Sequence, residues 1–380
     1  MDFSITDTQT AFLDTVDRFC AKHLPPAEVR RRDAAHMPPY DLLPAMGEAG
    51  LFRLALPEAQ GGLGEDWRSV ALVQERLGRH AYMAASIFNR VVGFGIASVL
   101  GYGNAAQQAA LLPGLAEGRL LIALALTEPG AGSDAAALAT RAERVEGGWR
   151  LFGRKTWISD AEGADFLLVA ARTAPGSQGA EGISMLLLPK GSAGVAMTRL
   201  EKIGNNCMPS FDIGFDGAFV PEGNLLGQEG RGFRHLLSTL AASRASMAAT
   251  VTGCAQAAVD AAVSHAKDRV QFGKPIGANQ AIRHTLATMQ MRVDQSRLTM
   301  RQLSWLIATG QPCRREAAQA KIIATECLQF VAHHGMQIMA SAGYAAGSDM
   351  QRYWRDSRLY TFGEGTSEIL RDVIAREMGL

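Results

Sequence analysis

The spacing of apolar residues changes character twice along this chain of 380 residues, and that change limits the folds open to it. Up to about residue 120 the apolar residues recur at helical spacing, as Phe12, Val16 and Phe19 do. Short strand-like segments separated by turn residues follow, and then the helical spacing returns. The chain also exceeds the size at which one hydrophobic core usually stops growing. We therefore predict an α+β protein, mainly α, with three domains at 1–120, 121–226 and 227–380.

Helices are predicted on both sides of the β domain. Start and stop signals mark helices over 7–22 and 40–49 near the amino terminus. Near the carboxyl end, a long helix is predicted from Pro312 to about Ala340. The helix before it carries an apolar stripe on three- and four-residue steps, interrupted by Ser296, which predicts the seam of a helix bundle. The members of this stripe are Ile282, Leu286, Met289, Val293, Met300, Leu303 and Ile307.

The central region carries the period-two signal of strands. Phe211, Ile213 and Phe215 alternate with small or polar residues, as in a strand that is buried on one face. Turn residues at 147–148 and 175–176 suit connections between antiparallel neighbours. We therefore expect a compact β domain.

Composition and charge exclude several classes of function. The formal net charge is +1 and the pI is about 7.7, so no overall field favours nucleic acid or an anionic membrane. The five cysteines contain no CxxC pair, which fits reduced thiols in a cytoplasm. The amino terminus lacks a secretory signal pattern, and the apolar run near 120–126 is too short to span a bilayer. His333 and His334 diverge around a helix, so we expect no metal site. We predict a cytoplasmic protein without nucleic-acid or membrane partners.

One acidic residue near the carboxyl end is a candidate general base. Glu364 stands between Gly363 and Gly365, immediately before a predicted helix with Thr366 as its N-cap. The flanking glycines leave the backbone open to a ligand and permit φ values that other residues avoid. A carboxylate held at such a junction suits proton abstraction. The same residues would also form an ordinary glycine-punctuated helix start, and they do not by themselves decide between the two interpretations.

Three other stretches could contact a ligand. The loop 127–134, TEPGAGSD, can direct backbone N–H groups and hydroxyls at a polar ligand edge, or form a plain turn. Trp157 and Ser159 lie on one side of a predicted strand, either as a ring-binding pair or as ordinary packing. The turn 269–280 combines an arginine, an aromatic residue and a glutamine, which could bind phosphate and stack on a ring or simply face solvent. None of these stretches is a GxGxxG motif or a P-loop, and no Ser-His-Asp order is present.

The chain resembles the acyl-CoA dehydrogenase family of flavoenzymes over essentially its whole length, in segments that occur in order: TEPGAGSD, the Trp-Ile-Ser strand, RxQFGKPI and RDSRLYTFGEGTSEI. The resemblance implies an all-α amino-terminal domain, a central antiparallel β-barrel-like domain and a carboxyl-terminal four-helix bundle. It also implies FAD as the cofactor and an acyl-CoA or another acyl thioester as the substrate. The implied partners are an electron-transfer flavoprotein as electron acceptor and further copies of the chain, in a dimer of dimers that shares FAD between subunits.

The resemblance assigns roles to individual positions. Glu364 matches the catalytic base, which removes the α proton of the thioester while a hydride leaves the β carbon for flavin N5. The positions matched to cofactor contacts are Leu126, Thr127, Ser133, Trp157, Ile158, Ser159, Arg269, Gln271, Phe272, Gln280, Gln337, Thr366 and Glu368. Those from Arg269 to Gln337 would reach FAD across a dimer interface. The positions matched to substrate contacts are Ser133, Arg244 and Gly365.

The chain departs from the family pattern at several positions. Ser243 stands where some members carry their base, which favours the carboxylate near the carboxyl end. Ala241 replaces a frequent aspartate, and Ala340 and Ser341 replace paired glycines near FAD. Gly363 replaces a bulky residue, which predicts a wider pocket for a branched or cyclic acyl group.

Other functions within the same fold stay open at this point. They are an acyl-carrier-protein dehydrogenase, an oxidase, an enoyl-thioester reductase, and a flavin-containing binding or stress-response protein with little dehydrogenase turnover. The near-neutral charge and the presence of Glu364 favour the dehydrogenase.

Overall fold

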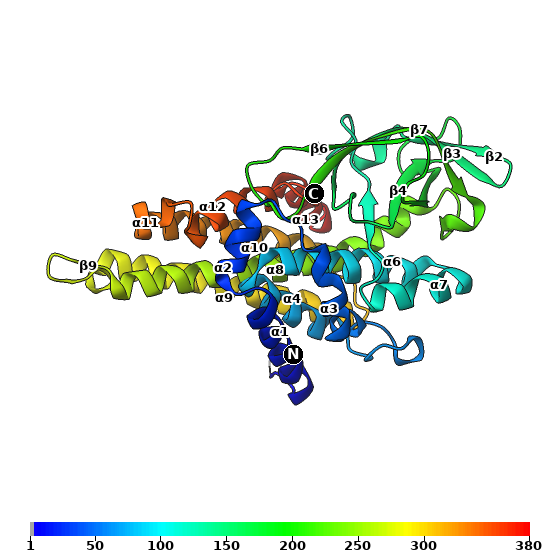
Figure 1. The fold of residues 1–380 in the computed structure, drawn as a ribbon. Coiled ribbons are helices and arrows are strands. Elements are labelled where there is room, and N and C mark those ends of the chain that lie inside the picture. The colour runs from blue at the N-terminus through cyan, green and yellow to red at the C-terminus, as the bar shows by residue number, and fades with distance from the viewer. Residues whose placement is uncertain (1–3) are drawn as a thin grey trace.

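The computed structural model describes residues 4–380 and shows an elongated layer of helices with a β domain on one side of it (Figure 1). The amino-terminal helices are α1 Asp7–His23, α2 Pro26–Ala34, α3 Leu43–Glu48, α4 Trp67–His80, α5 Tyr82–Asn89, α6 Ala97–Tyr102 and α7 Ala105–Ala116. A capping box between Thr6 and Gln9 starts α1, and the helix predicted over 7–22 is confirmed. The helix predicted over 40–49 forms as a 3₁₀ turn, Tyr40–Leu42, that continues into α3.

Helix α2 has no counterpart among the predicted helices. Its sequence offers one buried aliphatic side chain, Val29, while the charged Arg32 and Asp33 are also buried. Arg32 forms an ion pair with Asp41 at 2.7 Å, and Asp33 forms one with Arg355 at 2.6 Å. Charge pairing therefore holds this helix in place, and hydrophobic periodicity cannot detect such a helix.

The segment Tyr82–Tyr102 is one continuous helix, made of α5, a π-helical stretch over Arg90–Ile96 and α6. It is longer than the apolar run near 120–126, and by length and composition alone it could cross a membrane. In the fold, however, 78% of its most apolar window is buried inside the protein, which is typical of a core helix. π-helical stretches are frequent at functional sites, which makes this one a candidate border of the site.

The β domain contains β1 Ile122–Ala125, β2 Arg141–Val145, β3 Gly148–Ser159, β4 Phe166–Arg172, β5 Ile183–Pro189, β6 Val195–Leu200, β7 Ser210–Pro221 and β8 Leu225–Leu226. The strand order is β6-β7-β3-β2-β4-β5-β8, with β1 paired to β4. Most neighbours are antiparallel, as expected, but β1 and β2 lie parallel to β4. The sheet is therefore mixed, because the long connection between β1 and β4 allows a parallel crossover.

The sequence signals for the strands correspond to the observed register. Phe211, Ile213 and Phe215 are buried on β7, as their alternation predicts. The predicted turn at 147–148 closes the β2–β3 hairpin, with Gly147 in the left-handed region at φ 76°. The turn at 175–176 lies in the connection between the antiparallel strands β4 and β5.

The carboxyl-terminal region contains α8 Gly232–Asp268, the hairpin of β9 Val270–Gln271 and β10 Lys274–Pro275, α9 Gln280–Ala308, α10 Arg314–Met339, α11 Ser341–Tyr344, α12 Asp349–Tyr360 and α13 Ser367–Glu377. The predicted seam is confirmed, since Met289, Val293 and Leu303 of α9 are buried. Ser296 interrupts the apolar stripe without an unpaired hydroxyl, because its Oγ lies 2.6 Å from Oγ1 of Thr252 on α8.

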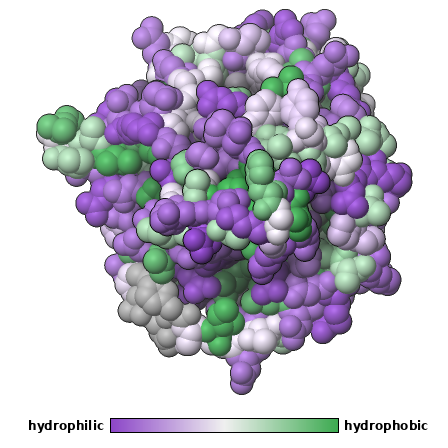
Figure 2. Space-filling view, turned by 90° about the vertical axis from the view of Figure 1, so that its left-hand side faces the viewer, coloured by the Kyte–Doolittle hydropathy of each residue, from purple (hydrophilic) through white to green (hydrophobic). Residues whose placement is uncertain are grey.

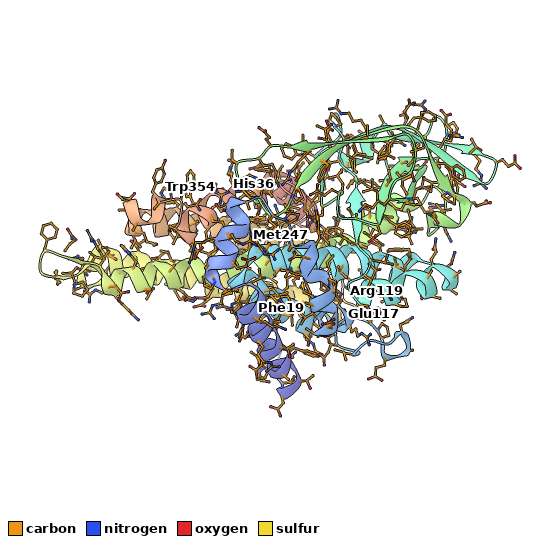
Figure 3. The ribbon with its side chains drawn as sticks, viewed as in Figure 1. Phe19, His36, Glu117, Arg119, Met247 and Trp354 are labelled. Atoms are coloured by element: carbon orange, nitrogen blue, oxygen red, sulfur yellow. The ribbon has the colours of Figure 1, made fainter. Side chains whose placement is uncertain are left out.

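The three parts of the chain meet beside the carboxyl-terminal helices. The backbone N–H of Asn205, in the loop between β6 and β7, donates to the Asp356 carboxylate of α12 at 2.6 Å. Arg199 of β6 donates to the backbone carbonyl of His36 at 3.2 Å. Figure 3 labels His36 and Trp354, which belong to the two segments joined by the ion pair between α2 and α12. These contacts hold the β domain over the turn that carries Glu364.

Candidate active site

Glu364 lies in the turn 361–366 between α12 and α13, with its backbone in the left-handed region at φ 56°. The next residue, Gly365, has φ 99°, so the turn requires a glycine directly beside the carboxylate. The Glu364 side chain is half-buried, and the hydroxyl of Ser243 on α8 donates to its Oε2 at 2.7 Å. Non-glycine residues in this backbone region cluster at functional sites. The structure therefore holds this carboxylate in a fixed orientation against α8.

Cationic side chains surround Glu364. Lys321 of α10 is fully buried and donates to the Gly365 carbonyl at 2.8 Å. Arg244 of α8 is also buried, and its Nη2 lies 3.8 Å from the position that a Cβ on Gly365 would occupy. Burial raises the pKa of Glu364 above its ordinary value. The hydrogen bond from α8 and the charges of Arg90, Arg244 and Lys321 partly offset this rise in pKa.

Arg90 begins the π-helical stretch and connects the end of β3 to this site. Its Nε donates to the buried carboxylate of Asp160 at 3.0 Å, directly after β3. Three residues earlier, Trp157 has φ 60° and an indole that is 55% exposed, where the register of β3 and β7 shifts between Lys155 and Ile158. Bulges of this kind re-aim side chains next to active sites. The indole therefore presents a flat face outward from the strand.

The two residues after Trp157 behave differently from each other. The side chain of Ile158 is buried in the core, so only its backbone is available to a ligand, whereas Ser159 is half-buried.

A buried ion pair supports the loop after β1. Lys155 of β3 is fully buried, and its Nζ donates to the Glu128 carboxylate at 2.7 Å and to the Leu126 carbonyl at 2.9 Å. Two backbone N–H groups also donate to the Glu128 carboxylate, at 2.6 and 2.9 Å. Thr127 is half-buried beside this pair and Ser133 is exposed farther along the loop. The start of the loop is thus fixed to β3, whereas the part around Ser133 faces solvent.

The last predicted contacts lie at the start of α13. Thr366 accepts a hydrogen bond from the backbone N–H of Ile369 at 3.2 Å, so its predicted role as N-cap is confirmed. Glu368 is exposed in the first turn of the same helix.

A second group of predicted cofactor residues lies far from Glu364 within one chain. Arg269 comes 25 residues after Arg244, which is about 38 Å along the axis of a helix such as α8. Gln337 comes 16 residues after Lys321 on α10, or about 24 Å. The residues of this group are Arg269, Gln271, Phe272, Gln280 and Gln337. One chain therefore does not bring them to the carboxylate.

The β9–β10 hairpin stands at the end of the helical layer that is farthest from the sheet (Figure 1). Its tip is apolar, with Phe272 99% exposed and Val270 52% exposed. Figure 2 views the molecule from this end and shows hydrophobic residues exposed among hydrophilic ones. Such a tip is typical of a surface that another protein chain covers.

Family models match the chain in three consecutive parts. Residues 6–119 match the acyl-CoA dehydrogenase N-terminal domain, 123–218 the middle domain and 230–379 the C-terminal domain. This chain belongs to the acyl-CoA dehydrogenase family. Across its whole length it is 35% identical to a probable acyl-CoA dehydrogenase of Bacillus subtilis, YngJ, and 36% identical to the benzylmalonyl-CoA dehydrogenase of Aromatoleum aromaticum, and it covers 100% of both relatives. The solved butyryl-CoA dehydrogenase of Megasphaera elsdenii superposes with a TM-score of 0.96 at 31% identity, covering 100% of each chain.

The acyl-CoA dehydrogenase is therefore a flavin oxidoreductase that acts on acyl thioesters, and its cofactor is FAD. Two features of the structure fit this cofactor. The exposed indole of Trp157, on a left-handed backbone, suits stacking against a flat ring system. The capped amino terminus of α13 points its backbone N–H groups toward the same turn that carries Glu364, which suits an electron-rich ligand edge.

No sequence pattern identified Arg90, Lys321 or Lys155 of this enzyme as part of the site. Lys321 was detectable in principle, because a lysine stands there in a stripe of α10 otherwise made of buried alanines and aliphatic residues. Arg90 and Lys155 give no such signal. Their roles depend on partners 70 and 27 residues away, which only the folded chain brings together.

Proposed function

We propose that this acyl-CoA dehydrogenase converts an acyl-CoA to its trans-2-enoyl-CoA, with Glu364 as the base that removes the α proton. The observation that carries the proposal is the environment of this carboxylate: half-buried, fixed by Ser243 and surrounded by cations. Burial makes a carboxylate a stronger proton acceptor, and the surrounding cations limit the rise in its pKa. When bound, FAD supplies the acceptor for the β hydride.

The chain also offers groups that would hold the thioester. The backbone N–H of Glu364 donates to no acceptor in the part of the chain that the structure describes. The same is true, within residues 4–380, of the buried Nε of Arg244. A hydrogen bond from such an N–H to the thioester oxygen would acidify the α C–H, because negative charge builds on that oxygen as the proton leaves. Gly365 leaves room for this approach, and Ser133 would lie on the CoA side.

The residues that would hold FAD fall into two groups. Trp157 and Ser159 of β3, the backbone of Ile158, and the loop after β1 with Leu126 and Thr127 form the first. Thr366 and Glu368 extend it at the start of α13. The second group, from the β9–β10 hairpin to Gln337, would come from another copy of the chain.

The distance between the two groups supports a homo-oligomer. About 38 Å of α8 separates Arg244 from Arg269, so a complete FAD site needs the hairpin of a partner. We propose a dimer that shares two such sites, and a dimer of dimers as the full assembly. Electrons would then pass from FAD to an electron-transfer flavoprotein.

Which acyl group the enzyme accepts must be argued from the residues of the pocket. The relatives from Aromatoleum aromaticum and Megasphaera elsdenii act on benzylmalonyl-CoA and butyryl-CoA, so membership of the family does not define it. At Gly363 a Cβ would meet only the Leu359 carbonyl, at 3.3 Å. This open space supports a pocket that accepts branched or cyclic acyl chains. A panel of straight, branched and alicyclic acyl-CoA esters tests it, and clear preference for straight chains would reject the idea.

The decisive experiment for the base compares Glu364→Gln with Glu146→Gln, a change at an exposed residue in the turn between β2 and β3. Anaerobic mixing of the yellow holoenzyme with acyl-CoA bleaches the flavin when dehydrogenation occurs. Loss of the base slows bleaching by between about a hundredfold and ten-thousandfold while FAD stays bound, whereas the surface variant behaves as the parent. Fast reduction in Glu364→Gln would move the role to another residue. DNA binding without bleaching in the parent would support the stress-response alternative instead.

A further inference from the structure

Two buried polar atoms face each other between the π-helical stretch and α8. They are Oδ1 of Asn89 and Oγ of Ser246, and neither has a hydrogen-bond partner within residues 4–380. Asn89 is 8% exposed and Ser246 is 1% exposed, so bulk water does not supply hydrogen bonds to these two side chains. An unpaired polar atom in a protein interior is destabilising, so each one calls for an explanation, and a ligand that completes the hydrogen bond is one such explanation.

Gly93 shows that the two atoms lie within about 6 Å of each other. A Cβ built on Gly93, in the middle of the π-helical stretch, would lie 2.1 Å from Oδ1 of Asn89 and 3.8 Å from Oγ of Ser246. Only the missing side chain of this glycine allows the amide to sit where it does. The π-helical stretch and the glycine therefore act together to turn a polar group toward α8.

This space is one helical turn away from the candidate base. Ser243, which donates to Glu364, and Ser246 are three residues apart on α8 and so share a face, with Cβ atoms about 5–6 Å apart. On the opposite side, Asn89 precedes Arg90, whose charge acts on Glu364. Met247, the next residue of α8, is labelled at the centre of the molecule in Figure 3. The pair thus lies about one turn of α8 away from the residue that contacts the candidate base.

The chemistry of the pair selects a neutral partner. Arg90, the cation next to Asn89 in the sequence, is already paired with Asp160 at 3.0 Å, so it is not free to bind a carboxylate that enters here. An amide and a serine hydroxyl are both satisfied by a group that donates and accepts, and an alcohol does both in either orientation of the amide. A plain hydrocarbon chain would leave both atoms unpaired.

We propose that Asn89 and Ser246 form a subsite for a hydroxyl group on the acyl chain, so that the substrate is a short or medium hydroxyacyl-CoA. The proposal rests on the proposed function, because it requires an acyl thioester at Glu364. The two recognition residues belong to α8 and to the end of α5, and they are separate from the base itself.

The test uses the holoenzyme, three matched six-carbon esters and one five-carbon ester that ends in a carboxylate. Steady-state rates and anaerobic bleaching are measured with hexanoyl-CoA, 5-hydroxyhexanoyl-CoA, 6-hydroxyhexanoyl-CoA and glutaryl-CoA. The better hydroxy ester exceeds hexanoyl-CoA in kcat/KM by about tenfold, the effect of one or two well-formed hydrogen bonds. In Asn89→Leu the ratio of kcat/KM for the hydroxy ester to kcat/KM for hexanoyl-CoA falls to one or below, and kcat/KM for hexanoyl-CoA rises. In Ser246→Ala, which removes a single oxygen, the ratio falls to a value between that of the parent and that of Asn89→Leu.

Ser304→Ala is the matched control, because it removes a buried serine hydroxyl on α9 that bonds to its own helix. Its substrate ratio stays at the parent value. Equal rates with hexanoyl-CoA and both hydroxy esters, a preference for glutaryl-CoA, or an unchanged ratio in Ser246→Ala would each overturn the proposed subsite while leaving Glu364 as the base. Absence of bleaching by every thioester, with FAD bound, would instead refute the proposed function and the subsite with it.

Discussion

Removal of the Ser243 hydroxyl tests how this enzyme tunes its base. The hydroxyl donates to Oε2 of Glu364 at 2.7 Å and therefore favours the ionised carboxylate. It works against burial, which raises the pKa of the same group. In Ser243→Ala this hydrogen bond no longer stabilises the ionised carboxylate, so the pKa of Glu364 rises further. A larger fraction of the base is then protonated at any given pH, and the acid limb of kcat/KM moves to higher pH.

The size of the effect follows from the kind of hydrogen bond. Hydrogen bonds to charged groups contribute about 1.5–3 kcal/mol, and a carboxylate that is only half-buried belongs at the lower end of that range. Since about 1.4 kcal/mol corresponds to a factor of ten, kcat/KM on the acid limb falls roughly tenfold. On the alkaline plateau both enzymes are fully ionised, and the variant is as fast as the parent or slightly faster because its base is stronger.

Stopped-flow bleaching of the flavin across a pH series measures the shift of the acid limb directly. The control is again Ser304→Ala, whose hydroxyl donates to the Met300 carbonyl at 2.8 Å and has no contact with the base. A uniform loss of rate at every pH would show that Ser243 acts through packing. A profile that coincides with that of the parent would show that the hydrogen bond does not tune Glu364, and the reasoning would be wrong.

Three further outcomes are expected from contacts elsewhere. Lys155→Met leaves the Glu128 carboxylate buried without its cation and lowers the free energy of unfolding by about 3–5 kcal/mol in urea titrations; a loss below about 1 kcal/mol would contradict this. Ala340 adopts φ 50° and ψ −132°, a glycine-like conformation, so Ala340→Gly stabilises the protein by about 1 kcal/mol, and a lower melting temperature would argue against that strain. Phe272→Ser removes the exposed tip of the hairpin, so light scattering detects a smaller assembly and the purified protein holds less FAD; unchanged mass and FAD content would reject the proposed interface.

Local patterns predicted the fold where local physics decides it. The helix over 7–22, the period-two strand signal at 210–215 and the seam of α9 each follow from periodicity within one element. Helix α2 and the parallel pairing of β1 with β4 did not follow. The first depends on ion pairs such as the one between Asp33 and Arg355, and the second on a crossover between segments more than 40 residues apart.

The same division applies to the site. Glu364 stood out because two glycines and a helix cap surround it in the sequence, and the cap is confirmed in the fold. The sequence also showed the departure from the family pattern at Ala340, but it did not show the consequence. The alanine adopts a backbone conformation that is typical of glycine, with a strained φ. Lys321 interrupts a mostly apolar stripe of α10, a signal that did not reveal its partner, and Arg90 had no pattern of its own. Their proximity to the carboxylate arises from packing among α10, α13 and the π-helical stretch.

One turn of α8 carries three separable functions in this arrangement. Ser243 contacts the base, Arg244 has a buried Nε with no acceptor within residues 4–380, and Ser246 faces the proposed acyl subsite. Because each of the three side chains acts on a different group, their substitutions affect different kinetic quantities. Loss of the first moves the pH profile, loss of the second raises KM for the CoA ester, and loss of the third changes acyl preference. A variant of any one of them that changed all three quantities together would show that this turn acts as one packed unit, and the assignment of separate roles would not stand.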